Sequence, residues 1–480
     1  MNAQTKTYHI ITWGCQMNEE DSEQMGLFLE QHGYLPVASA DEADLVLLNT
    51  CSVRQKPEEK VFSKLGELRQ AKRKNPAMVI GVCGCMAQIQ ADQIRRRAPH
   101  VDFIVGTGHS AEVPELARRV LEARTLHGGD VPPIVQTTLP PRRGAVVAEV
   151  PLRAINRPAQ VRAYVPIMYG CDRFCTFCVV PATRGRERSR PPEDVLMEIE
   201  SLARRGTREV TLLGQTVNSY GRNLPGQRVS FSDLLRRIAR IPGIERIRFT
   251  SPHPRGFTDE LIETIATVPQ ICEHVHLPLQ AAEDELLRRM KRGYTVEEYW
   301  NILCKLRKAV PGIAVTTDIM LGFPGETDEQ FRATLDFVRR ARFDAAFMFA
   351  YSPRPGTAAA EMPDQVPDEV KIARLSALIE VQNRISAEIN ASLCGRVVEV
   401  LVEGPASRTP NQISGLTRTF KTVHIDVPAA GASGAAPRPG DLVMVQVVHG
   451  GLTGLNGRLV DGTTRCEPAG VPLATRVARQ

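Results

Sequence analysis

The chain reads GCDRFCTFC at residues 170–178, which gives Cys171, Cys175 and Cys178 the spacing C-x3-C-x2-C. The loop directly follows the apolar segment Val161 to Met168, which we expect to be a strand. Three thiolates on one short loop can hold three irons of a [4Fe–4S] cluster and leave the fourth iron without a protein ligand. A structural zinc site ordinarily needs a fourth Cys or His nearby, and residues 179–188 contain none. The spacing therefore favours an iron–sulfur cluster with one open iron over zinc.

The surrounding part of the chain, residues 161–393, alternates apolar segments with amphipathic ones. The segment Pro192 to Arg205, for example, places its apolar residues on one face of a helix. Six strands separated by helices predict a parallel, partial or full (β/α) barrel. The expected strands are Val161 to Met168, Glu209 to Leu213, Ile244 to Thr250, His274 to Pro278, Val315 to Met320 and Ala346 to Tyr351.

The N-terminal part, residues 1–125, has the same alternation on a smaller scale and predicts an open, mostly parallel α/β sheet. Cys15, Cys51 and Cys85 each stand just after an expected strand. The carboxyl ends of parallel strands share one edge, so these cysteines can converge there and bind a second cluster. A single free buried cysteine is common, but three at equivalent positions favour a site. The expected strands are Tyr8 to Trp13, Leu45 to Leu48, Met78 to Val82 and Phe103 to Val105.

Cys83 offers an alternative ligand for this second site, since it precedes Cys85 by two residues. Side chains two residues apart in a strand point to the same face of the sheet. Geometry alone therefore leaves both cysteines open as ligands.

The other segments complete the domain organisation. Residues 126–160 contain six prolines and are interpreted as a linker. Residues 394–462 are rich in β-type segments and predict a small β-barrel, with a long loop at Ala429 to Gly440. Residues 463–480 are expected to form a tail.

Composition limits the class of protein. A chain of 480 residues with 42% hydrophobic and 24% charged residues has material for several globular domains. The formal charge of +6 favours a polyanionic partner. No apolar run is long enough to span a bilayer and the N-terminus lacks signal-peptide features, so we expect a cytoplasmic protein. Eleven cysteines without an export signal favour metal or redox use over disulfides.

These motifs together resemble the methylthiotransferase family of radical S-adenosylmethionine (SAM) enzymes. The loop at 170–178 resembles that of the radical SAM superfamily, and residues 394–462 resemble the TRAM domain, an RNA-binding barrel. The sequence Gly14-Cys15-Gln16-Met17-Asn18 resembles the branch of the family that modifies tRNA. The resemblance extends from Tyr8 to about Leu459 and includes Asn49 to Arg54, Gly84 to Gln88, Leu213 to Asn218, Thr250 to Pro254 and Ser352 to Thr357.

The resemblance implies two [4Fe–4S] clusters with different tasks. Cys171, Cys175 and Cys178 are implied to hold the cluster that cleaves SAM, and Cys15, Cys51 and Cys85 an auxiliary cluster that delivers the methylated sulfur. Cys85 is preferred over Cys83 because its flanking residues match the family. The implied reaction adds a methylthio group to C2 of N6-(dimethylallyl)adenosine at position 37 of tRNA, beside the anticodon. We nominate no general base, since the cofactors supply the chemistry.

Further residues are candidates for binding SAM or RNA. Phe177 resembles the family's aromatic position beside the adenine of SAM, although a core role is an open alternative. Gly322 and Glu326 lie in a Gly-Pro segment that is either a wall of the SAM pocket or a tight turn. Gln215 and Asn218, which follow an expected strand, complete the candidate SAM pocket. Arg418, Phe420 and Lys421 interleave charge with an aromatic ring, a pattern suited to RNA or to an ordinary exposed strand.

Several features stay open between functional and structural interpretations. His253 and His276 lie near strand ends that face the expected site, and the run Arg184 to Arg190 can grip phosphates or form solvated surface. Alternative activities are methylthiolation of threonylcarbamoyl-adenosine in tRNA or of a ribosomal-protein aspartate. A non-catalytic iron–sulfur RNA-binding protein is a third alternative. The expected partners are tRNA and an electron donor such as flavodoxin or ferredoxin, and we expect a monomer without membrane contact.

Overall fold

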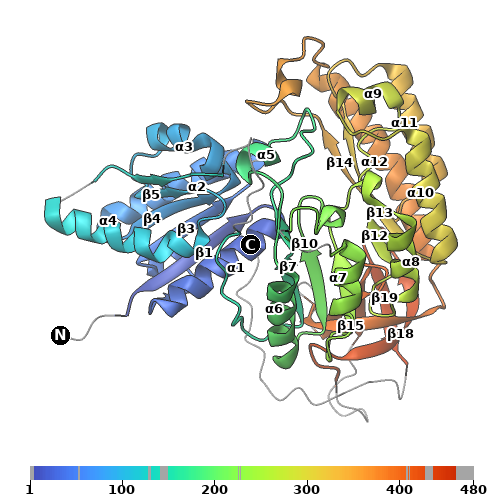
Figure 1. Ribbon diagram of the computed structural model, residues 1–480, viewed down its shortest axis with the longest axis horizontal. Coiled ribbons are helices and arrows are strands. Elements are labelled where there is room, and N and C mark those ends of the chain that lie inside the picture. The colour runs from blue at the N-terminus through green and yellow to red at the C-terminus, as the bar shows by residue number, and fades with distance from the viewer. Residues whose placement is uncertain are drawn as a thin grey trace.

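The computed structural model describes residues 5–51, 55–127, 131–140, 150–224, 226, 229–406, 409, 411–426 and 436–460. The expected tail at 463–480, and most of the expected loop at Ala429 to Gly440, lie outside the described residues. In the described part, no helix is both long and apolar enough to cross a membrane. Figure 1 shows three regions, with the N-terminal sheet beside the central strands and the C-terminal barrel beneath them.

The N-terminal domain is a parallel sheet with strand order β2-β1-β3-β4-β5-β6, as the open α/β prediction requires. Its central strands β3 and β4 are buried along their whole length, which explains their continuous apolar sequence. Helices α2 and α3 pack on one face, and α1 and α4 on the other. The elements are β1 Thr7–Trp13, α1 Gln16–Gln31, β2 Leu35–Pro36, η1 Ala40–Glu42, β3 Leu45–Thr50, α2 Gln55–Lys74, β4 Val79–Gly84, α3 Cys85–Arg97, β5 Phe103–Val105, η2 Ser110–Glu112, α4 Val113–His127 and β6 Ile134–Gln136.

The segment at 126–160, interpreted above as a linker, is partly built into the fold. Ile134–Gln136 form β6, which pairs with β5 in parallel. Its neighbours Pro132 and Pro133 are tolerated because β6 is an edge strand. A residue without an N–H at the edge of a sheet does not remove a hydrogen bond between two central strands. Arg157, near the end of the segment, is fully buried. Proline content alone therefore did not reveal the packing of this segment.

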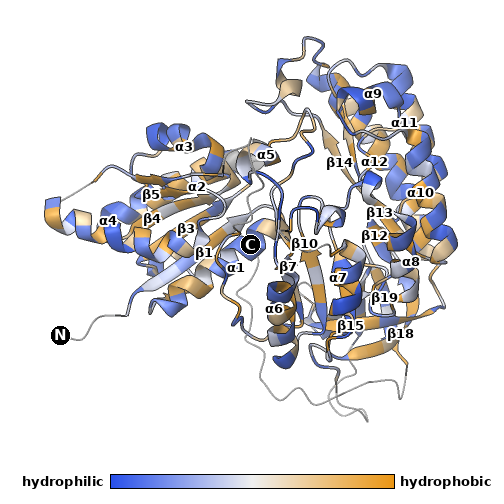
Figure 2. Cartoon of the chain, viewed as in Figure 1, coloured by the Kyte–Doolittle hydropathy of each residue, from blue (hydrophilic) through white to orange (hydrophobic). Residues whose placement is uncertain are grey.

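The central domain contains six parallel strands that form a partial barrel, as predicted. The sheets β7-β10-β11 and β12-β13-β14 are joined by a parallel bridge between Ile247 and Ile271. Helices pack on the outside of the strands, where their apolar faces share one large core with the sheet. Figure 2 shows the hydrophobic strands β10 and β14 beside helices of mixed colour. The strands are β7 Arg162–Pro166, β8 Met168–Tyr169, β9 Arg188–Ser189, β10 Glu209–Leu213, β11 Arg246–Phe249, β12 His274–His276, β13 Ala314–Leu321 and β14 Ala345–Ala350. The helices are α5 Val180–Thr183, α6 Pro192–Arg204, η3 Val217–Ser219, α7 Phe231–Ile238, η4 Pro254–Gly256, α8 Asp259–Thr267, α9 Asp284–Arg289, α10 Val296–Ala309, α11 Asp328–Ala341, η5 Ala358–Glu361 and α12 Asp368–Ala391.

The C-terminal domain is a closed barrel in the order β15-β16-β17-β19-β18, as predicted. Alternate residues of its strands, such as Val400, Val423 and Val445, fill the interior. The strands are β15 Val397–Pro405, β16 Gln412–Thr417, β17 Thr422–Asp426, β18 Leu442–Gly450 and β19 Leu455–Leu459.

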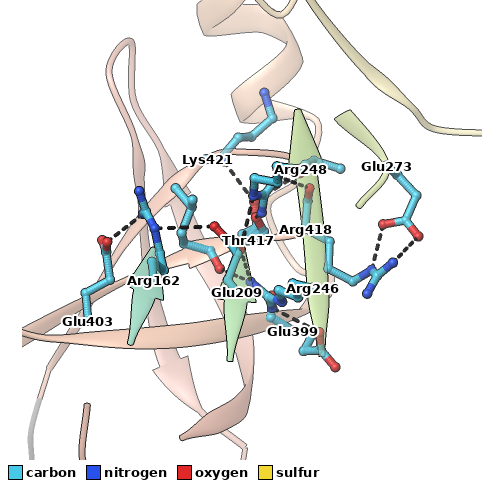
Figure 3. A network of polar contacts seen from close by, with 12 residues as sticks. Arg162, Glu209, Arg246, Arg248, Glu273, Glu399, Glu403, Thr417, Arg418 and Lys421 are labelled. Atoms are coloured by element: carbon cyan, nitrogen blue, oxygen red, sulfur yellow. Dashed lines mark hydrogen bonds and ion pairs between the residues drawn. The ribbon is translucent and has the colours of Figure 1, made fainter. Parts of the chain in front are cut away.

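This barrel docks on the amino ends of the central strands (Figure 3). Arg246, the first residue of β11, is fully buried and donates to the carbonyl oxygen of Leu416 at 2.6 Å. Arg248 donates to two carbonyl oxygens of the turn after β16, at 2.7 and 2.8 Å. Its Nε also lies 3.0 Å from the buried carboxylate of Glu209. The C-terminal barrel therefore closes the amino end of the sheet and leaves the carboxyl end to other residues.

A buried group of charged residues joins the N-terminal and central domains. Arg153 lies 2.6 Å from the carboxylate of Glu20 on α1 and 2.8 Å from that of Glu198 on α6. Arg157 forms a second bridge, 2.6 Å from Glu23 and 2.9 Å from Glu198. These four ion pairs hold α1 of one domain against α6 of the other.

Candidate functional site

The loop at 170–178 lies at the carboxyl end of the central sheet, after β7 and β8. Thr176 fixes the loop from two sides: its N–H donates to the carbonyl oxygen of Met290 at 3.1 Å, and its carbonyl oxygen accepts from Ala359 at 2.9 Å. Its hydroxyl donates to the carbonyl oxygen of Arg289 at 3.0 Å. The three thiols are thus held by hydrogen bonds to segments far away in the sequence.

Two polar side chains contact the thiols of this loop directly. The hydroxyl of Thr216, after β10, lies 3.5 Å from Cys171 Sγ. Arg292 donates from Nη1 to Cys175 Sγ at 3.3 Å and from Nε to the hydroxyl of Tyr294 at 3.2 Å. Arg292 is 8% exposed, so its positive charge faces the thiol with little screening by water. Both contacts place polar groups directly against the sulfur atoms of the loop.

The three N-terminal cysteines lie together at the carboxyl edge of their sheet. Cys15 caps the amino end of α1, Cys51 follows β3, and Cys85 begins α3. A hydrogen bond with Cys51, more than compensating the effect of burial, lowers the pKa of the Cys15 thiol to about 6, and nearby Arg184 lowers it further. The structure therefore brings together three residues that are separated by more than thirty positions each.

Amide side chains hold the ends of these strands in register. Cys15 Sγ donates to Asn18 Oδ1 at 3.4 Å, and Asn18 Nδ2 donates to Asn49 Oδ1 at 3.1 Å. Asn49 Nδ2 returns a hydrogen bond to the Asn18 carbonyl oxygen at 2.8 Å. This explains why amide residues occur next to both Cys15 and Cys51 in the sequence.

Cys83 is turned away from this edge, which removes the ambiguity left by the sequence. Its side chain packs in the core between the sheet and helices α1 and α4. Strand β4 ends at Gly84, whose φ of 90° redirects the chain, so Cys85 belongs to α3 and the alternation of a strand does not apply to it. Burial raises the pKa of the Cys83 thiol and also that of Cys85, so the position of the side chain and not its acidity favours Cys85 as the ligand.

A short segment joins the two cysteine sites. Arg184 directly follows α5, which begins two residues after Cys178. Its Nη2 lies 2.7 Å from Asp21 Oδ2 on α1, and its positive charge acts on both Cys15 and Cys85. The hydroxyl of Thr107, after β5, also donates to the carbonyl oxygen of Thr183. The chain therefore passes from one cysteine site straight to the other.

Both sites fit [4Fe–4S] clusters in the chemistry of their donors. Each offers three thiols and a buried arginine, Arg292 at one site and Arg184 at the other, which balances the negative charge of a thiolate-bound cluster. Within the described ranges, no group of three or more Cys, His, Asp or Glu is arranged to hold a single metal ion.

The candidate SAM residues do not all gather at one place. Phe177 is half-buried and packs against the central core. Gln215 precedes Thr216, and its buried Oε1 has no hydrogen-bond partner in the described structure. Asn218 exchanges two hydrogen bonds with the backbone of His253, at 2.8 and 2.9 Å, and borders a cavity of about 760 Å³. Gln215 thus keeps one acceptor unpaired, whereas Asn218 fixes the loops after β10 and β11.

Gly322 and Glu326 lie in a segment that contacts α12. Glu326 Oε2 accepts from the Gly322 N–H at 2.6 Å and from Arg374 on α12 at 2.8 Å. A Cβ at Gly322 would lie 2.3 Å from the side chain of Lys371, also on α12. These contacts anchor α12, while the buried Glu326 Oε1 has no hydrogen-bond partner in the described structure, so the expected role toward SAM stays a prediction.

The three residues expected to bind RNA contact the central domain instead. Arg418 Nε lies 2.7 Å from Glu273 (Figure 3). Lys421 Nζ lies 2.8 Å from Asp344. The ring of Phe420 stacks on His274, with 4.6 Å between ring centroids and 13° between planes. These contacts dock the barrel on the central domain, and a contact of the same residues with RNA stays a prediction.

Four functional candidates were missed by the sequence reasoning or left open. Thr216 and Arg292 carry no motif of metal ligation, and Arg184 was weighed only as part of a charge run. His253 is buried, and its Nε2 has no hydrogen-bond partner among the described residues. Burial and nearby Arg292 lower the pKa of His253 to about 2, so the ring is neutral. The usable signal was position, since Thr216 and His253 both follow strands at the carboxyl end.

Comparison with known proteins agrees with this arrangement. Residues 165–338 match the radical SAM superfamily, and residues 7–106 match a family described as uncharacterized protein family UPF0004. The chain resembles the solved structure of a radical SAM methyltransferase from Kitasatospora setae, with a TM-score of 0.52 and 17% identity over 74% of this chain and 77% of that one. Fold and cysteine loop thus define a radical SAM protein.

Full-length relatives give a narrower assignment. The chain is 48% identical to a tRNA-2-methylthio-N(6)-dimethylallyladenosine synthase from Carboxydothermus hydrogenoformans, over 95% of this chain and 99% of that protein. It is 47% identical to a synthase of the same name from Moorella thermoacetica, over the same shares. The chain belongs to the family of tRNA-2-methylthio-N(6)-dimethylallyladenosine synthases.

Proposed function

We propose that this protein adds a methylthio group to C2 of N6-dimethylallyladenosine beside the anticodon of tRNA. The main support for this proposal is that α5 and Arg184 connect the two cysteine sites directly. A reaction that needs both a radical and a sulfur donor requires two metal centres close together. The names of the relatives give the nucleoside on which those proteins act.

The chain's own residues divide the work between two sites. Cys171, Cys175 and Cys178 would hold the cluster whose open iron binds SAM, and Cys15, Cys51 and Cys85 the auxiliary cluster. When bound, SAM and the clusters supply the radical, the methyl group and the sulfur. Around them, Thr216 and Arg292 orient the thiolates of the first set.

The auxiliary site receives its own electrostatic support. Arg184 lies between Asp21 and the thiols, where its charge stabilises thiolates against the cost of burial. Gln215, with its unpaired Oε1 after β10, is the residue we assign to SAM at the other site.

The remaining partners follow from the proposed chemistry. Reductive cleavage of SAM needs one electron, which a small electron carrier such as a flavodoxin or ferredoxin would supply. We propose that the protein acts as a monomer in the cytoplasm, where tRNA is modified. The docked C-terminal barrel would bind the tRNA through surfaces other than its docking face.

The test is mass spectrometry of nucleosides from tRNA of cells that lack the gene, compared with complemented cells. Loss of the 2-methylthio group from N6-dimethylallyladenosine, with restoration on complementation, would support the proposal. Loss of methylthio from threonylcarbamoyl-adenosine, or from a ribosomal protein, would instead assign the chain to one of the alternative activities.

A further inference from the structure

The inner face of the central sheet is a surface that neither cysteine site uses. In β12, β13 and β14 alternate residues point away from the helices, because the residues between them, such as Val275, Val315 and Ile319, fill the outer core. The strand registers place His276 beside Thr316, and Asp318 beside Phe347. We call His276, Asp318, Phe347 and their neighbours Met320 and Phe349 the inner face.

The C-terminal barrel closes this inner face from below. Phe420 stacks on His274 at the first position of β12, and the Arg248 guanidinium lies 5.2 Å from the centre of the Phe420 ring. Lys421 is bound to Asp344, next to the start of β14. A group that enters between the strands therefore reaches a floor made by the C-terminal domain and must come from the end that carries the cysteines.

A chain of hydrogen bonds runs from this floor up the inner face. His274 Nε2 lies 3.1 Å from the hydroxyl of Thr316, which lies 3.0 Å from His276 Nδ1. His276 Nε2 lies 3.1 Å from Asp318 Oδ2. Because a carboxylate only accepts, the hydrogen bond to Asp318 requires a proton on His276 Nε2. The chain fixes Asp318 with its other oxygen, Oδ1, left without a hydrogen bond from the described residues.

An exposed aromatic residue stands beside Asp318 on the neighbouring strand. Phe347 is 51% exposed, meets the His276 ring edge to face at 5.7 Å and stands beside Asp318 in the sheet. Met320 and Phe349, on the same face, are half-buried. An apolar patch beside one hydrogen-bond acceptor is the usual composition of a small-ligand site.

Contacts lead from this face to the cysteine loop. Asp318 accepts through its carbonyl oxygen from the N–H of Gln280 at 2.8 Å. One residue earlier, Leu279 accepts from the hydroxyl of Tyr294, which in turn binds Arg292, the partner of Cys175. The inner face is thus structurally continuous with the place where the radical would form.

We propose that Asp318 and Phe347 form the recognition site for the N6-substituted adenine of the substrate. The N6 nitrogen of this base retains a single N–H, which the free oxygen of Asp318 accepts. The five-carbon dimethylallyl chain packs on Phe347, with Met320 and Phe349 beside it. This assignment rests on the proposed function and deepens it, since it makes Phe347 the residue that distinguishes prenylated from unprenylated RNA.

The experiment uses the full-length, cluster-loaded protein and two anticodon stem-loop RNAs that differ only in the dimethylallyl group. Kd and kcat/KM are measured for both RNAs with the unsubstituted protein, Phe347→Ala, Asp318→Asn and the control Met197→Ala, which removes an equally exposed apolar side chain from α6. Phe347→Ala should lower the preference for prenylated RNA by roughly tenfold or more, since apolar contacts of this size discriminate by that order. Asp318→Asn should weaken the binding of both RNAs equally, because both adenines carry a hydrogen on N6.

The outcomes separate the two levels of the proposal. Unchanged preference in Phe347→Ala, with iron content and melting temperature as in the unsubstituted protein, would overturn the recognition site while the proposed function stands. Absence of any methylthiolated product from the unsubstituted protein would instead overturn the proposed function. A loss of preference in Met197→Ala as large as in Phe347→Ala would also count against the site.

Discussion

The two ends of the central sheet carry polar residues of opposite character. At the amino end, Arg246, Arg248 and Glu209 are buried and bound to one another or to the C-terminal barrel. At the carboxyl end, thiols face arginines. Buried side-chain atoms without a hydrogen-bond partner occur at both ends, for example on Glu209 and on Gln215, but the cysteine loop lies at the carboxyl end. The amino end therefore serves assembly and the carboxyl end serves chemistry, as in other barrels of parallel strands.

The largest expected effect comes from the carboxyl end. Replacing Cys171, Cys175 and Cys178 together by Ala should abolish cleavage of SAM to 5′-deoxyadenosine, because no other described thiols can present an open iron at this end. Iron content after anaerobic reconstitution should fall from about eight to about four per chain. Chromatography of 5′-deoxyadenosine and an iron assay provide the two measurements.

The matched control replaces Cys15, Cys51 and Cys85 by Ala. This variant should also lose about four irons but still release 5′-deoxyadenosine while making no methylthiolated nucleoside. If the central triple variant lost all its iron, or the N-terminal variant still made product, the division into two sites would be wrong. Melting temperatures of both variants show whether they remain folded.

Substitutions at the amino end of the central sheet should lower the stability of the fold and leave the cluster sites intact. Arg248→Met removes the partner at 3.0 Å from the buried Glu209 carboxylate and two hydrogen bonds to the C-terminal barrel. We expect the free energy of unfolding to fall by about 3–5 kcal/mol, with iron content unchanged. Arg236→Met, which breaks an exposed ion pair with Glu260, should cost no more than about 1 kcal/mol. The free energies of unfolding are measured by denaturant titration. If Arg248→Met and Arg236→Met lowered the free energy of unfolding equally, the buried pair would contribute no more to stability than the exposed one.

A smaller effect is expected from pH at the docking face. Burial, followed by nearby Arg248, lowers the pKa of His274 well below its usual value. The unfolded state then binds a proton below about pH 6.5 that the folded state does not, so stability falls as the pH drops. When the pH falls from 7.5 to 5.5, His274 should lower the free energy of unfolding by about 1.4 kcal/mol.

His274→Gln should remove that part of the pH dependence. The comparison is made as the difference between the two proteins in unfolding free energy at each pH, so other titrating groups cancel. A pH profile that stays the same in His274→Gln would mean that the pKa of His274 does not differ between the folded and unfolded states.

The smallest effect concerns the cysteine that the sequence left ambiguous. Cys83→Ala should leave iron content at its full level and lower the free energy of unfolding by about 1 kcal/mol, because it creates a small core cavity. Cys85→Ala should lower the iron content. If Cys83→Ala lost as much iron as Cys85→Ala, the ligand assignment would be reversed.

The sequence predicted the three architectures and the strands of both parallel sheets because apolar periodicity and β-α alternation are local patterns. Cysteine positions were equally readable, since each follows a strand. What escaped prediction depends on contacts between distant segments. The chain gives no local sign that Arg184 reaches Asp21, that Arg292 reaches Cys175, or that Phe420 stacks on His274.

Two interpretations needed contacts that the sequence does not show. Arg418, Phe420 and Lys421 contact the central domain, so their proposed contact with RNA stays a prediction. Proline content suggested a linker at 126–160, but Arg157 in this segment is fully buried and paired with Glu198. Amino-acid composition does not distinguish an arginine that is exposed to solvent from one that is buried in an ion pair.

The segment between Cys178 and Arg184 has a consequence for how the family can vary. Within this segment α5 contributes four helical residues, which rise about 6 Å and turn by about 100° each. One inserted residue would therefore rotate Arg184 by more than a quarter turn and aim it away from Asp21, whatever residue was inserted. We expect the length of this segment to be invariant among functional variants while most of its side chains are free to change.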